Sequence, residues 1–449
     1  MRQIFTEGAT GGGGDLVILN ARVWPAPDAP VSPPQTILVR EGVIISVGKS
    51  HSMSSEIPRL DACGRIVTAG FTNCHIHLTE SVWAGARTGS IAKLQAALDD
   101  MFLCHGFTTV FDLSSHPRNT PALISRIESG ELRGPLILSA GSGLRPWNGV
   151  PFYVKGSVPW YSRWMMPGPA TALGARLTVV MQARAGARLT KLFTGSYVTP
   201  SRVKPMSLHI ARAAVDEAHR HGLHVLAHPS NREGVAVAIG AGVDALAHLP
   251  DETAGTESLL ADAARLGIRV VPTLHMFAAT VTTDDNYLAP IRTALRNFIV
   301  AGGKVMFGTD VGYMADRETR PEFVAMSASG MSTADILRAL TVEPAAFLGW
   351  ADTGEIRPGA RADLTMLTTN ATSLTATDFA GVHTVIRGGK VVYGTPELDH
   401  SLLRTAGLWP AAGALRPAGE PKVVTACWRE LRPLSAPLRQ RNCRVAPNA

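Results

Sequence analysis

The sequence has few cysteines and no long apolar run. Its five cysteines are odd in number and lack Cys-x-x-Cys spacing, so neither a disulfide framework nor a cysteine zinc site is indicated. No apolar run approaches the roughly 18 residues that a membrane-spanning helix needs, so no membrane partner is expected. Residues 1–14 are polar, end in four glycines and lack the apolar segment of a signal peptide. We expect a flexible leader and a cytoplasmic protein.

Excess positive charge is confined to one segment. The formal net charge is +7, from 43 Lys and Arg residues against 36 Asp and Glu residues. Residues 401–449 contain eight basic and two acidic residues, a net charge of +6, which leaves about +1 for the rest of the chain. No basic stripe with interleaved aromatic residues and no recognisable nucleic-acid module occurs elsewhere. We therefore expect no nucleic-acid partner.

The central part of the chain alternates short β-branched runs with stretches of helical periodicity. The runs lie at 66–68, 108–113, 136–139, 189–193, 224–228, 245–248, 269–273 and 305–309. Eight strand–helix units over about 280 residues predict an α/β fold, a (β/α)8 TIM barrel. A doubly wound sheet would place a glycine-rich phosphate turn after an early strand, and the sequence has none.

Both chain ends contain further short strand-like segments. They lie at 15–24 and 36–47, and again at 362–367 and 383–393. We expect these segments to pair in a small β-sandwich domain that consists of residues 15–64 and 355–395, beside a barrel domain of residues 65–354. The tail at 396–449 is basic and rich in Pro and Arg, and we interpret it as irregular. Helices are expected at 205–221, 256–266, 288–301 and 332–348.

Metal-ligand residue types occur where the expected barrel strands end. The segment Ala69-Gly-Phe-Thr-Asn-Cys-His75-Ile-His77 places two imidazoles on one side of a strand, where they can hold one metal ion. Alone, this spacing can be incidental. Four further strands carry Lys191, His228, His248 and Asp310 at or near their ends. Because the carboxyl ends of barrel strands meet at one mouth, the set favours a metal site over separate, ordinary polar residues.

The sequence resembles the amidohydrolase superfamily, in the branch that contains imidazolonepropionase and the prolidase-like metallopeptidases. The resemblance covers about residues 15–393. Its motifs are Asp61-Ala-Cys-Gly-Arg-Ile-Val-Thr-Ala-Gly-Phe-Thr-Asn-Cys-His-Ile-His77, Gly242-Val-Asp-Ala-Leu-Ala-His248, Thr341-Val-Glu-Pro-Ala-Ala-Phe-Leu-Gly-Trp350 and Gly354-Glu-Ile-Arg-Pro-Gly-Ala-Arg-Ala-Asp-Leu364. The chain departs from relatives at Ala69, where they usually have Pro, and it lacks their Gly-Gly-His-type turn within 141–186. Dipeptide specificity is therefore not carried over.

The resemblance implies two divalent metal ions, usually zinc. His75, His77 and Asp310 would hold the more buried ion, and His228 and His248 the more exposed one. Lys191, carboxylated by CO2, would bridge them, because a carbamate is an anionic ligand whereas a lysine cation repels metals. The alternative for Lys191 is an ordinary salt-bridging lysine. Imidazolonepropionase-like relatives use one metal ion and no bridging lysine.

The implied activity is hydrolysis of a C–N bond of amide, peptide or carbamate type by a metal-activated water. Asp310 would act as the general base and then protonate the leaving nitrogen. Tyr197 is a candidate donor to the oxyanion, or a pocket wall residue. His275 is a candidate substrate or oxyanion contact, or a packing and capping residue. The expected substrate is a small amide or dipeptide-like molecule, and the enzyme is expected to be a homo-oligomer.

Two other functions are weighed against this one. A mononuclear, imidazolonepropionase-like cyclic amide hydrolase would leave Lys191 without a carbamate. A catalytically silent barrel would need a broken ligand set, and the set is complete. Serine catalysis is disfavoured because no Gly-x-Ser-x-Gly turn occurs.

The segment 141–186 is rich in aromatic residues. It contains six of them within 18 residues, namely Trp147, Phe152, Tyr153, Trp160, Tyr161 and Trp164. Loops over a barrel mouth commonly form substrate lids, so we expect this one to line an aromatic-tolerant pocket. A contact between subunits or simple loop packing is the alternative.

Overall fold

The computed structural model describes residues 13–49, 57–155, 166–371 and 373–394, which all belong to one compact unit. The basic tail at 396–449, most of the leader, and Trp160, Tyr161 and Trp164 lie outside the described residues. Within the described ranges, no helix has the length and apolar character needed to span a membrane.

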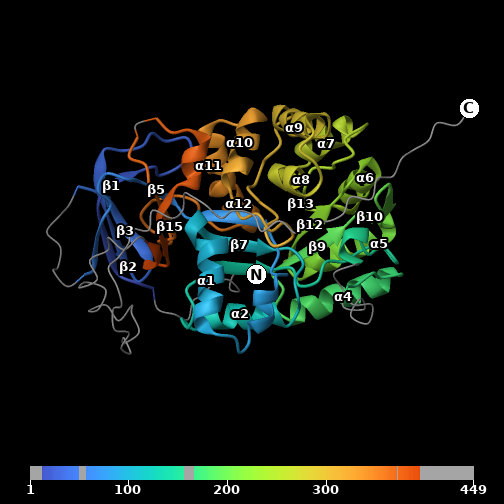
Figure 1. Cartoon of the computed structure of the whole chain (residues 1–449), viewed down its shortest axis with the longest axis horizontal. Helices are drawn as coiled ribbons and strands as arrows, with labels where there is room; N and C mark the ends of the chain where they lie inside the picture. Colours follow the sequence, from blue (N-terminus) through green and yellow to red (C-terminus); the bar gives the residue numbers. More distant parts are fainter. Residues whose placement is uncertain (1–12, 50–56, 156–165, 372, 395–449) are drawn as a thin grey trace, which may run out of the picture. The chain divides into compact units, whose positions relative to one another are not determined.

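Strands from both ends of the described chain form one eight-stranded sheet, seen in blue and orange-red in Figure 1. Its strands are β1 (Leu16–Val23), β2 (Pro34–Arg40), β3 (Val43–Gly48), β4 (Arg59–Asp61), β5 (Ile66–Ala69), β15 (Leu364–Leu367), β16 (Val382–Arg387) and β17 (Lys390–Gly394). The order is β17-β16-β15-β5-β1-β2-β3, with β4 paired to β1. The two chain ends thus combine in one sheet with its own apolar core. Its description as a β-sandwich stays a prediction.

One strand that was expected in the barrel belongs to this sheet. β5, which contains the run 66–68, pairs in parallel with β1 and antiparallel with β15. The first strand of the barrel-like part is β6 (Phe71–Ile76). A Cβ at Gly70, between the two strands, would collide with the side chain of Thr108, so the chain changes sheets at a residue without a side chain. Both strands are buried throughout, and the sequence pattern therefore did not distinguish them.

The central part consists of parallel strands in two groups. One sheet has the order β6-β7-β8 and the other the order β14-β13-β12-β9. Their bounds are β7 (Phe107–Asp112), β8 (Leu136–Ser139), β9 (Leu189–Phe193), β12 (His224–His228), β13 (Ala245–Ala247) and β14 (Arg269–Val271). On one side the groups are connected by two backbone hydrogen bonds: the N–H of Leu144 donates to the carbonyl oxygen of Lys191, and the N–H of Phe193 donates to that of Leu144. The arrangement is TIM-barrel-like.

The eighth expected run, 305–309, is not a continuous strand. Val305 forms a parallel bridge to Val270, and Val311 forms one to Ile76. The backbone N–H of Cys74 donates to the carbonyl oxygen of Phe307. This segment therefore lies between β14 and β6, and it brings the residues after 309 to the carboxyl end of β6.

The helices alternate with the strands as the periodicity predicts. They are α1 (Ile91–Met101), α2 (Asn119–Glu128), α3 (Phe152–Lys155), α4 (Ala172–Arg184), α5 (Leu208–Arg220), α6 (Arg232–Ala241), α7 (Glu257–Arg265), α8 (Leu274–Thr280), α9 (Asp285–Val300), α10 (Arg320–Ala328), α11 (Thr333–Leu340) and α12 (Val342–Leu348). A hairpin of β10 (Gly195–Thr199) and β11 (Arg202–Pro205) precedes α5. The helix expected at 332–348 is two helices that meet at Thr341. Ser332 caps α11 in a capping box with Asp335.

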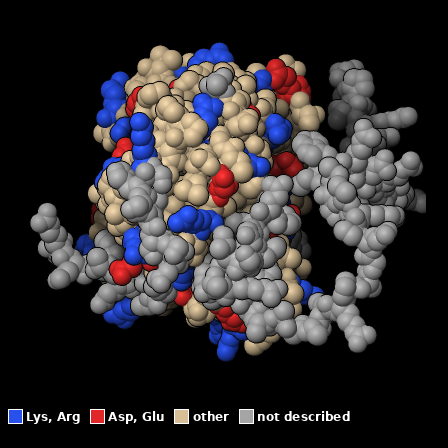
Figure 2. Space-filling view, turned by 90° about the vertical axis from the view of Figure 1, so that its left-hand side faces the viewer, with Lys and Arg blue, Asp and Glu red and all other residues tan. Residues whose placement is uncertain are grey.

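The core follows from the amphipathic helices. In α5, the buried residues Ala211, Ala214, Val215 and Ala218 recur at helical spacing and face the strands. Figure 2 is a space-filling view of the left-hand side of Figure 1, and it shows basic and acidic side chains scattered among uncharged residues over the described part of that side. This agrees with the small net charge of the chain outside its tail.

Candidate metal centre

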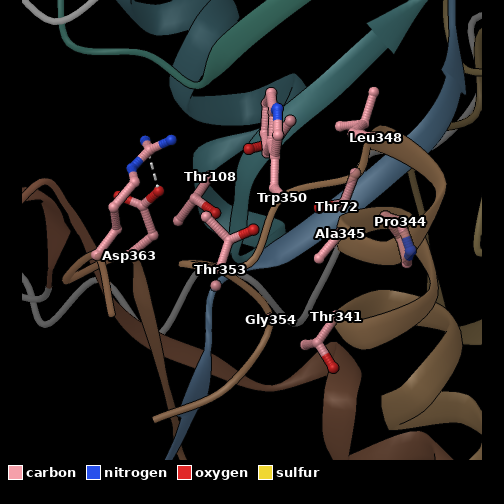
Figure 3. Close-up of a pocket in the computed structure, with 13 residues that line it drawn as sticks. Thr72, Thr108, Thr341, Pro344, Ala345, Leu348, Trp350, Thr353, Gly354 and Asp363 are labelled. Carbon is pink, nitrogen blue, oxygen red and sulfur yellow. Dashed lines mark ion pairs between the residues drawn. The ribbon is translucent and has the colours of Figure 1, made fainter. Parts of the chain in front are cut away.

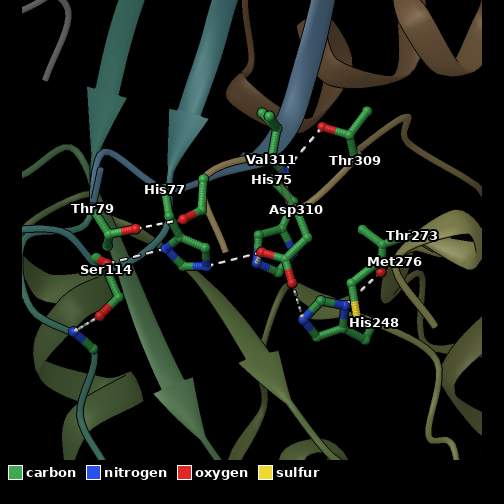
Figure 4. A network of polar contacts seen from close by, with 12 residues as sticks. His75, His77, Thr79, Ser114, His248, Thr273, Met276, Thr309, Asp310 and Val311 are labelled. Atoms are coloured by element: carbon green, nitrogen blue, oxygen red, sulfur yellow. Dashed lines mark hydrogen bonds and ion pairs between the residues drawn. The ribbon is translucent and has the colours of Figure 1, made fainter. Parts of the chain in front are cut away.

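The six predicted ligand residues meet at the carboxyl ends of the parallel strands. His75 lies at the end of β6 and His77 directly after it, and His228 ends β12. The remaining three are Lys191 within β9, His248 after β13, and Asp310 after the 305–309 segment. Residues at these positions share one mouth because parallel strands all end on the same side. Figure 4 shows four of them pointing toward one another.

Asp310 occupies the centre of the cluster. Its Oδ1 atom lies 3.0 Å from Nε2 of His77 and 3.4 Å from Nε2 of His75, and its Oδ2 atom lies 3.6 Å from Nε2 of His248. The nearest ligand atoms of His75, His248 and Asp310 all lie within 4.8 Å of one another. Nζ of Lys191 is 3.4 Å from Nε2 of His75, and the rings of His228 and His248 are 4.8 Å apart. The residues named from the sequence are thus brought together.

Hydrogen bonds fix the protonated nitrogen of two histidines. Nδ1 of His77 lies 3.0 Å from the carbonyl oxygen of Ser114, which can only accept, so Nδ1 carries the proton. Nδ1 of His248 lies 2.5 Å from Oγ1 of Thr273. That hydroxyl donates its own proton to the carbonyl oxygen of Pro272, so it accepts from His248. Both Nε2 atoms therefore present lone pairs toward Asp310.

A cation fits between these groups. A histidine lone pair and a carboxylate oxygen at 3.0 Å repel each other unless a proton or a metal ion lies between them. Nδ1 of His75 and Oδ1 of Asp310 are buried and have no hydrogen-bond partner within the described part of the chain. Imidazole nitrogens with one carboxylate form a donor set typical of zinc and other first-row divalent metals. The donor chemistry thus fits a divalent metal ion.

Burial favours the neutral form of four basic groups of the cluster. Burial, followed by the positive charge of Lys191, lowers the pKa of His75 and of His228 well below the usual range. For His248, burial and then the neighbouring His228 lower the pKa. Burial also lowers the pKa of Lys191 to about 7. Neutral imidazoles can bind a metal, and a neutral amine is the form of lysine that reacts with CO2.

The backbone is held in an unusual conformation around the cluster. Four non-glycine residues near the cluster have positive φ, namely Ser114 at 115°, His248 at 109°, Thr273 at 46° and Asp310 at 61°. Such conformations are unfavourable and persist only where the surrounding structure holds them. Their concentration at two predicted ligands and at the two residues that hydrogen-bond His77 and His248 indicates a functional site.

Tyr197 and His275, the two candidate contacts to the oxyanion or substrate, make their polar contacts with residues outside the cluster. The hydroxyl of Tyr197, on β10, lies 2.9 Å from Oδ2 of Asp251 and 2.9 Å from Oε1 of Glu252. His275, in α8, has Nε2 2.8 Å from Oδ2 of Asp316. Tyr197 has one proton, which these two carboxylates share. To donate to an oxyanion, Tyr197 must withdraw this proton from Asp251 and Glu252. The roles of Tyr197 and His275 stay predictions.

Part of the aromatic segment lies beside the cluster. The ring of Tyr153, on α3, lies 5.4 Å from the ring of Tyr313, which follows Asp310 by three residues. Trp147 is exposed. The described portion of the segment therefore reaches the mouth through Tyr153. Its action as a lid stays a prediction.

Three residues that support the site are not among those predicted from the sequence. Ser114 and Thr273 orient His77 and His248, and each stands at or just after the end of an expected strand, a position that is a usable signal. Glu322, on α10, is fully buried and accepts the backbone N–H groups of Leu274 at 3.0 Å and His275 at 2.6 Å. Burial raises the pKa of Glu322 to about 7. Nothing in the sequence around Glu322 signals this contact with α8.

A hollow in the structure lies away from the cluster, at the amino ends of β6 and β7. Thr72, Thr108, Trp350 and Thr353 line it, with Asp363 at one side (Figure 3). The carboxylate of Asp363 pairs with Arg361 at 2.8 Å. Since the predicted ligands all lie at the opposite ends of the strands, this hollow is not part of the candidate metal centre.

The chain matches the model of the amidohydrolase family over residues 66–392, and it therefore belongs to that family. A search of curated proteins gives no match. Family membership supports a metal-dependent hydrolase that acts on C–N bonds.

Several solved structures are similar to the chain. A prolidase complexed with N-methylphosphonate-L-proline is 23% identical, with a TM-score of 0.69, over 85% of this chain and 100% of that one. A Xaa-Pro dipeptidase with methionine in its active site is 22% identical, with a TM-score of 0.71 over the same shares. An ochratoxinase from A. niger is 22% identical, with a TM-score of 0.67, over 85% and 96%. At these identities the likeness shows the TIM-barrel-like fold. The imidazolonepropionase-like branch stays a prediction.

Proposed function

We propose that the chain hydrolyses an amide, peptide or carbamate-type C–N bond at a centre of two divalent metal ions. The observation that carries the proposal is the meeting of Asp310 with two histidine lone pairs, next to a buried lysine whose Nζ atom lies 3.4 Å from Nε2 of His75. Both lone pairs are fixed by hydrogen bonds on the far side of the rings. Such an arrangement favours a bound cation over a network of ordinary hydrogen bonds.

The division of ligands follows the family resemblance. We assign His75, His77 and Asp310 to one ion, and His228 and His248 to the other. Lys191, as a carbamate formed with CO2, offers two oxygen atoms that would join the ions. The position of its Nζ atom beside His75 and its complete burial support this assignment. We expect zinc, since imidazole nitrogens dominate the donor set.

The chain's own residues supply the proton transfers. Divalent metal ions at such a site polarise the scissile carbonyl and lower the pKa of water. Asp310 accepts the proton of the attacking water and then delivers it to the leaving nitrogen, so that the amine departs neutral. Ser114 and Thr273 keep the lone pairs of His77 and His248 directed at the centre.

A mononuclear cyclic amide hydrolase is the second candidate. It is favoured by the tight group of His75, His248 and Asp310, which suffices to hold one ion. In that case Lys191 remains an amine beside His75. The two candidates predict different metal contents and different masses at Lys191.

The test of the proposal is hydrolysis by the metal-loaded protein of a panel of dipeptides, N-acyl amino acids, carbamates and cyclic amides. We expect activity that a chelator removes and that added zinc restores. The His77→Asn variant should lose metal and activity together. The exposed His209 lies on α5, away from the cluster, and His209→Asn is the matched control. Activity that persists after complete removal of metal contradicts the proposal.

A further inference from the structure

Arg145 is a buried arginine next to the metal centre. It follows β8, and its side chain is 5% exposed. Its backbone N–H donates to the carbonyl oxygen of Pro167 at 2.8 Å. The neighbouring N–H of Leu144 donates to the carbonyl oxygen of Lys191 at 2.9 Å. The chain at Arg145 is thus fixed against the strand that carries Lys191.

The guanidinium group of Arg145 has no acidic partner within the described ranges. Nη1 donates to the carbonyl oxygen of Gly143 at 2.8 Å, and Nη2 reaches Oγ of Ser114 only at 3.5 Å. Nε is buried and has no hydrogen-bond partner among the residues that the structure describes. Residues 156–165, whose structure is not described, include no Asp or Glu. Among the described residues this buried cation therefore has no counter-charge, and burying a charge without one costs free energy.

The unsatisfied donors lie on one edge of the guanidinium. Nε and Nη2 form the side-on edge that binds a carboxylate through two parallel hydrogen bonds, and both are poorly satisfied here. Burial lowers the pKa of Arg145 to about 10, which still leaves the group positively charged at neutral pH. The group therefore offers a charged, preformed and largely unused fork.

The same group lies close to the predicted metal ligands. Its central carbon is 4.5 Å from the ring centre of Phe193, and Nζ of Lys191 is 5.4 Å from the same ring. The ring of His228 lies 5.2 Å from Phe193. Ser114, which Arg145 approaches through Oγ, accepts the hydrogen bond of His77 through its carbonyl oxygen. Arg145 is thus separated by one residue, Phe193 or Ser114, from ligands assigned to both metal ions.

We propose that Arg145 binds a carboxylate of the substrate, and that the enzyme acts on N-acyl amino acids, dipeptides with a free carboxyl end included. The inference rests on the proposed function, because it requires hydrolysis at the adjacent centre. In an N-acyl amino acid, the carboxylate is attached to the carbon that carries the scissile nitrogen. A scissile carbonyl at the ligand cluster therefore places the carboxylate a few bonds away, toward a neighbouring wall such as Phe193 and Arg145. Neutral ureas and amides lack this group.

The experiment compares binding of matched acids and amides to the metal-loaded enzyme. The probes are N-acetyl-L-amino acids with apolar, polar and charged side chains, each with its carboxamide. Calorimetry gives the affinity of probes that are not hydrolysed during the titration, and KM is compared for those that are. We expect at least one acid to bind about 10- to 100-fold more tightly than its amide, as two charge-assisted hydrogen bonds predict. Arg145→Gln should reduce that preference by the same factor, with little change for the amide. Arg145→Lys should restore part of it, and it replaces Arg145→Gln if the latter does not fold. Arg133→Gln, at a half-exposed site, is the control.

The outcomes separate the inference from the proposed function. An equal preference for the acid in Arg145→Gln means that the metal ions alone bind the carboxylate, and this overturns the inference. Equal loss for acid and amide, with loss of bound metal, assigns Arg145 to the support of Lys191 and also overturns it. Equal hydrolysis of acid and amide by the natural chain keeps the proposed function and overturns the inference. Acid-selective binding through Arg145 without any hydrolysis supports the inference and overturns the proposed function.

Discussion

The Asp310→Asn variant tests the assignment of the general base. The substitution keeps the size of the side chain and one oxygen atom, but it removes the negative charge that faces His75, His77 and His248 at 3.0–3.6 Å. It also puts an NH2 group where one oxygen was, and this group can donate to a histidine lone pair instead of sharing a cation with it. The variant therefore lacks a proton acceptor at the centre of the site.

The expected loss follows from the contribution of a positioned base. General acid–base catalysis contributes about 10²- to 10⁴-fold, or about 3–5 kcal/mol of activation free energy. We expect a loss of that size in kcat, measured on the metal-loaded variant with the best substrate of the panel. Metal content must be measured on the same sample, because a loss of metal lowers activity by another route.

The control is Asp262→Asn, at a partly exposed carboxylate of α7 that pairs only with Arg265 among the described residues. This variant should retain the kinetics of the natural chain. Full activity of Asp310→Asn with both metal ions bound contradicts the assignment of Asp310 as the general base, because the proton of the attacking water then has another acceptor.

Two further predictions concern residues that support the site. Thr273→Val removes the acceptor that holds Nδ1 of His248 and should weaken metal binding or activity by about 10- to 100-fold, whereas Thr273→Ser should retain both. Metal titration of the natural chain and the two variants measures the effect. Equal metal affinities of the three proteins contradict the orienting role of Thr273. Burial raises the pKa of Glu322 from 4.5 to about 7, so the folded state holds a proton that the unfolded state has released between these pH values. The free energy of unfolding should therefore fall as pH rises through this window, by on the order of 3 kcal/mol, and Glu322→Gln should remove that slope in urea titrations at pH 4.5 and 7.5. Parallel pH curves for the two proteins contradict the assignment.

The parts of the site that the sequence predicts are those that follow from strand periodicity. His75 and His77 are two residues apart, and His228, His248 and Asp310 end short apolar runs, so each position follows from local pattern and from the rule that parallel strands end together. The structure brings all of them to one cluster.

The remaining features depend on contacts between distant segments. β5 and β6 are both wholly buried, and only their pairing partners show that they belong to different sheets. The run 305–309 has the composition of a strand, but its backbone makes only isolated bridges. Arg145 and Glu322 are charged residues whose burial depends on tertiary packing, and no local pattern marks them. Local periodicity predicts the elements and strand ends, while tertiary packing decides the partners.

The proposed pair of metal ions is joined through Lys191. It can be tested by elemental analysis of the protein, purified without chelator or added metal, and of the Lys191→Ala variant. We expect about two divalent ions per chain, with a loss of metal in the variant. About one ion per chain in both proteins contradicts the pair, leaves Lys191 as an amine beside His75, and favours the mononuclear cyclic amide hydrolase.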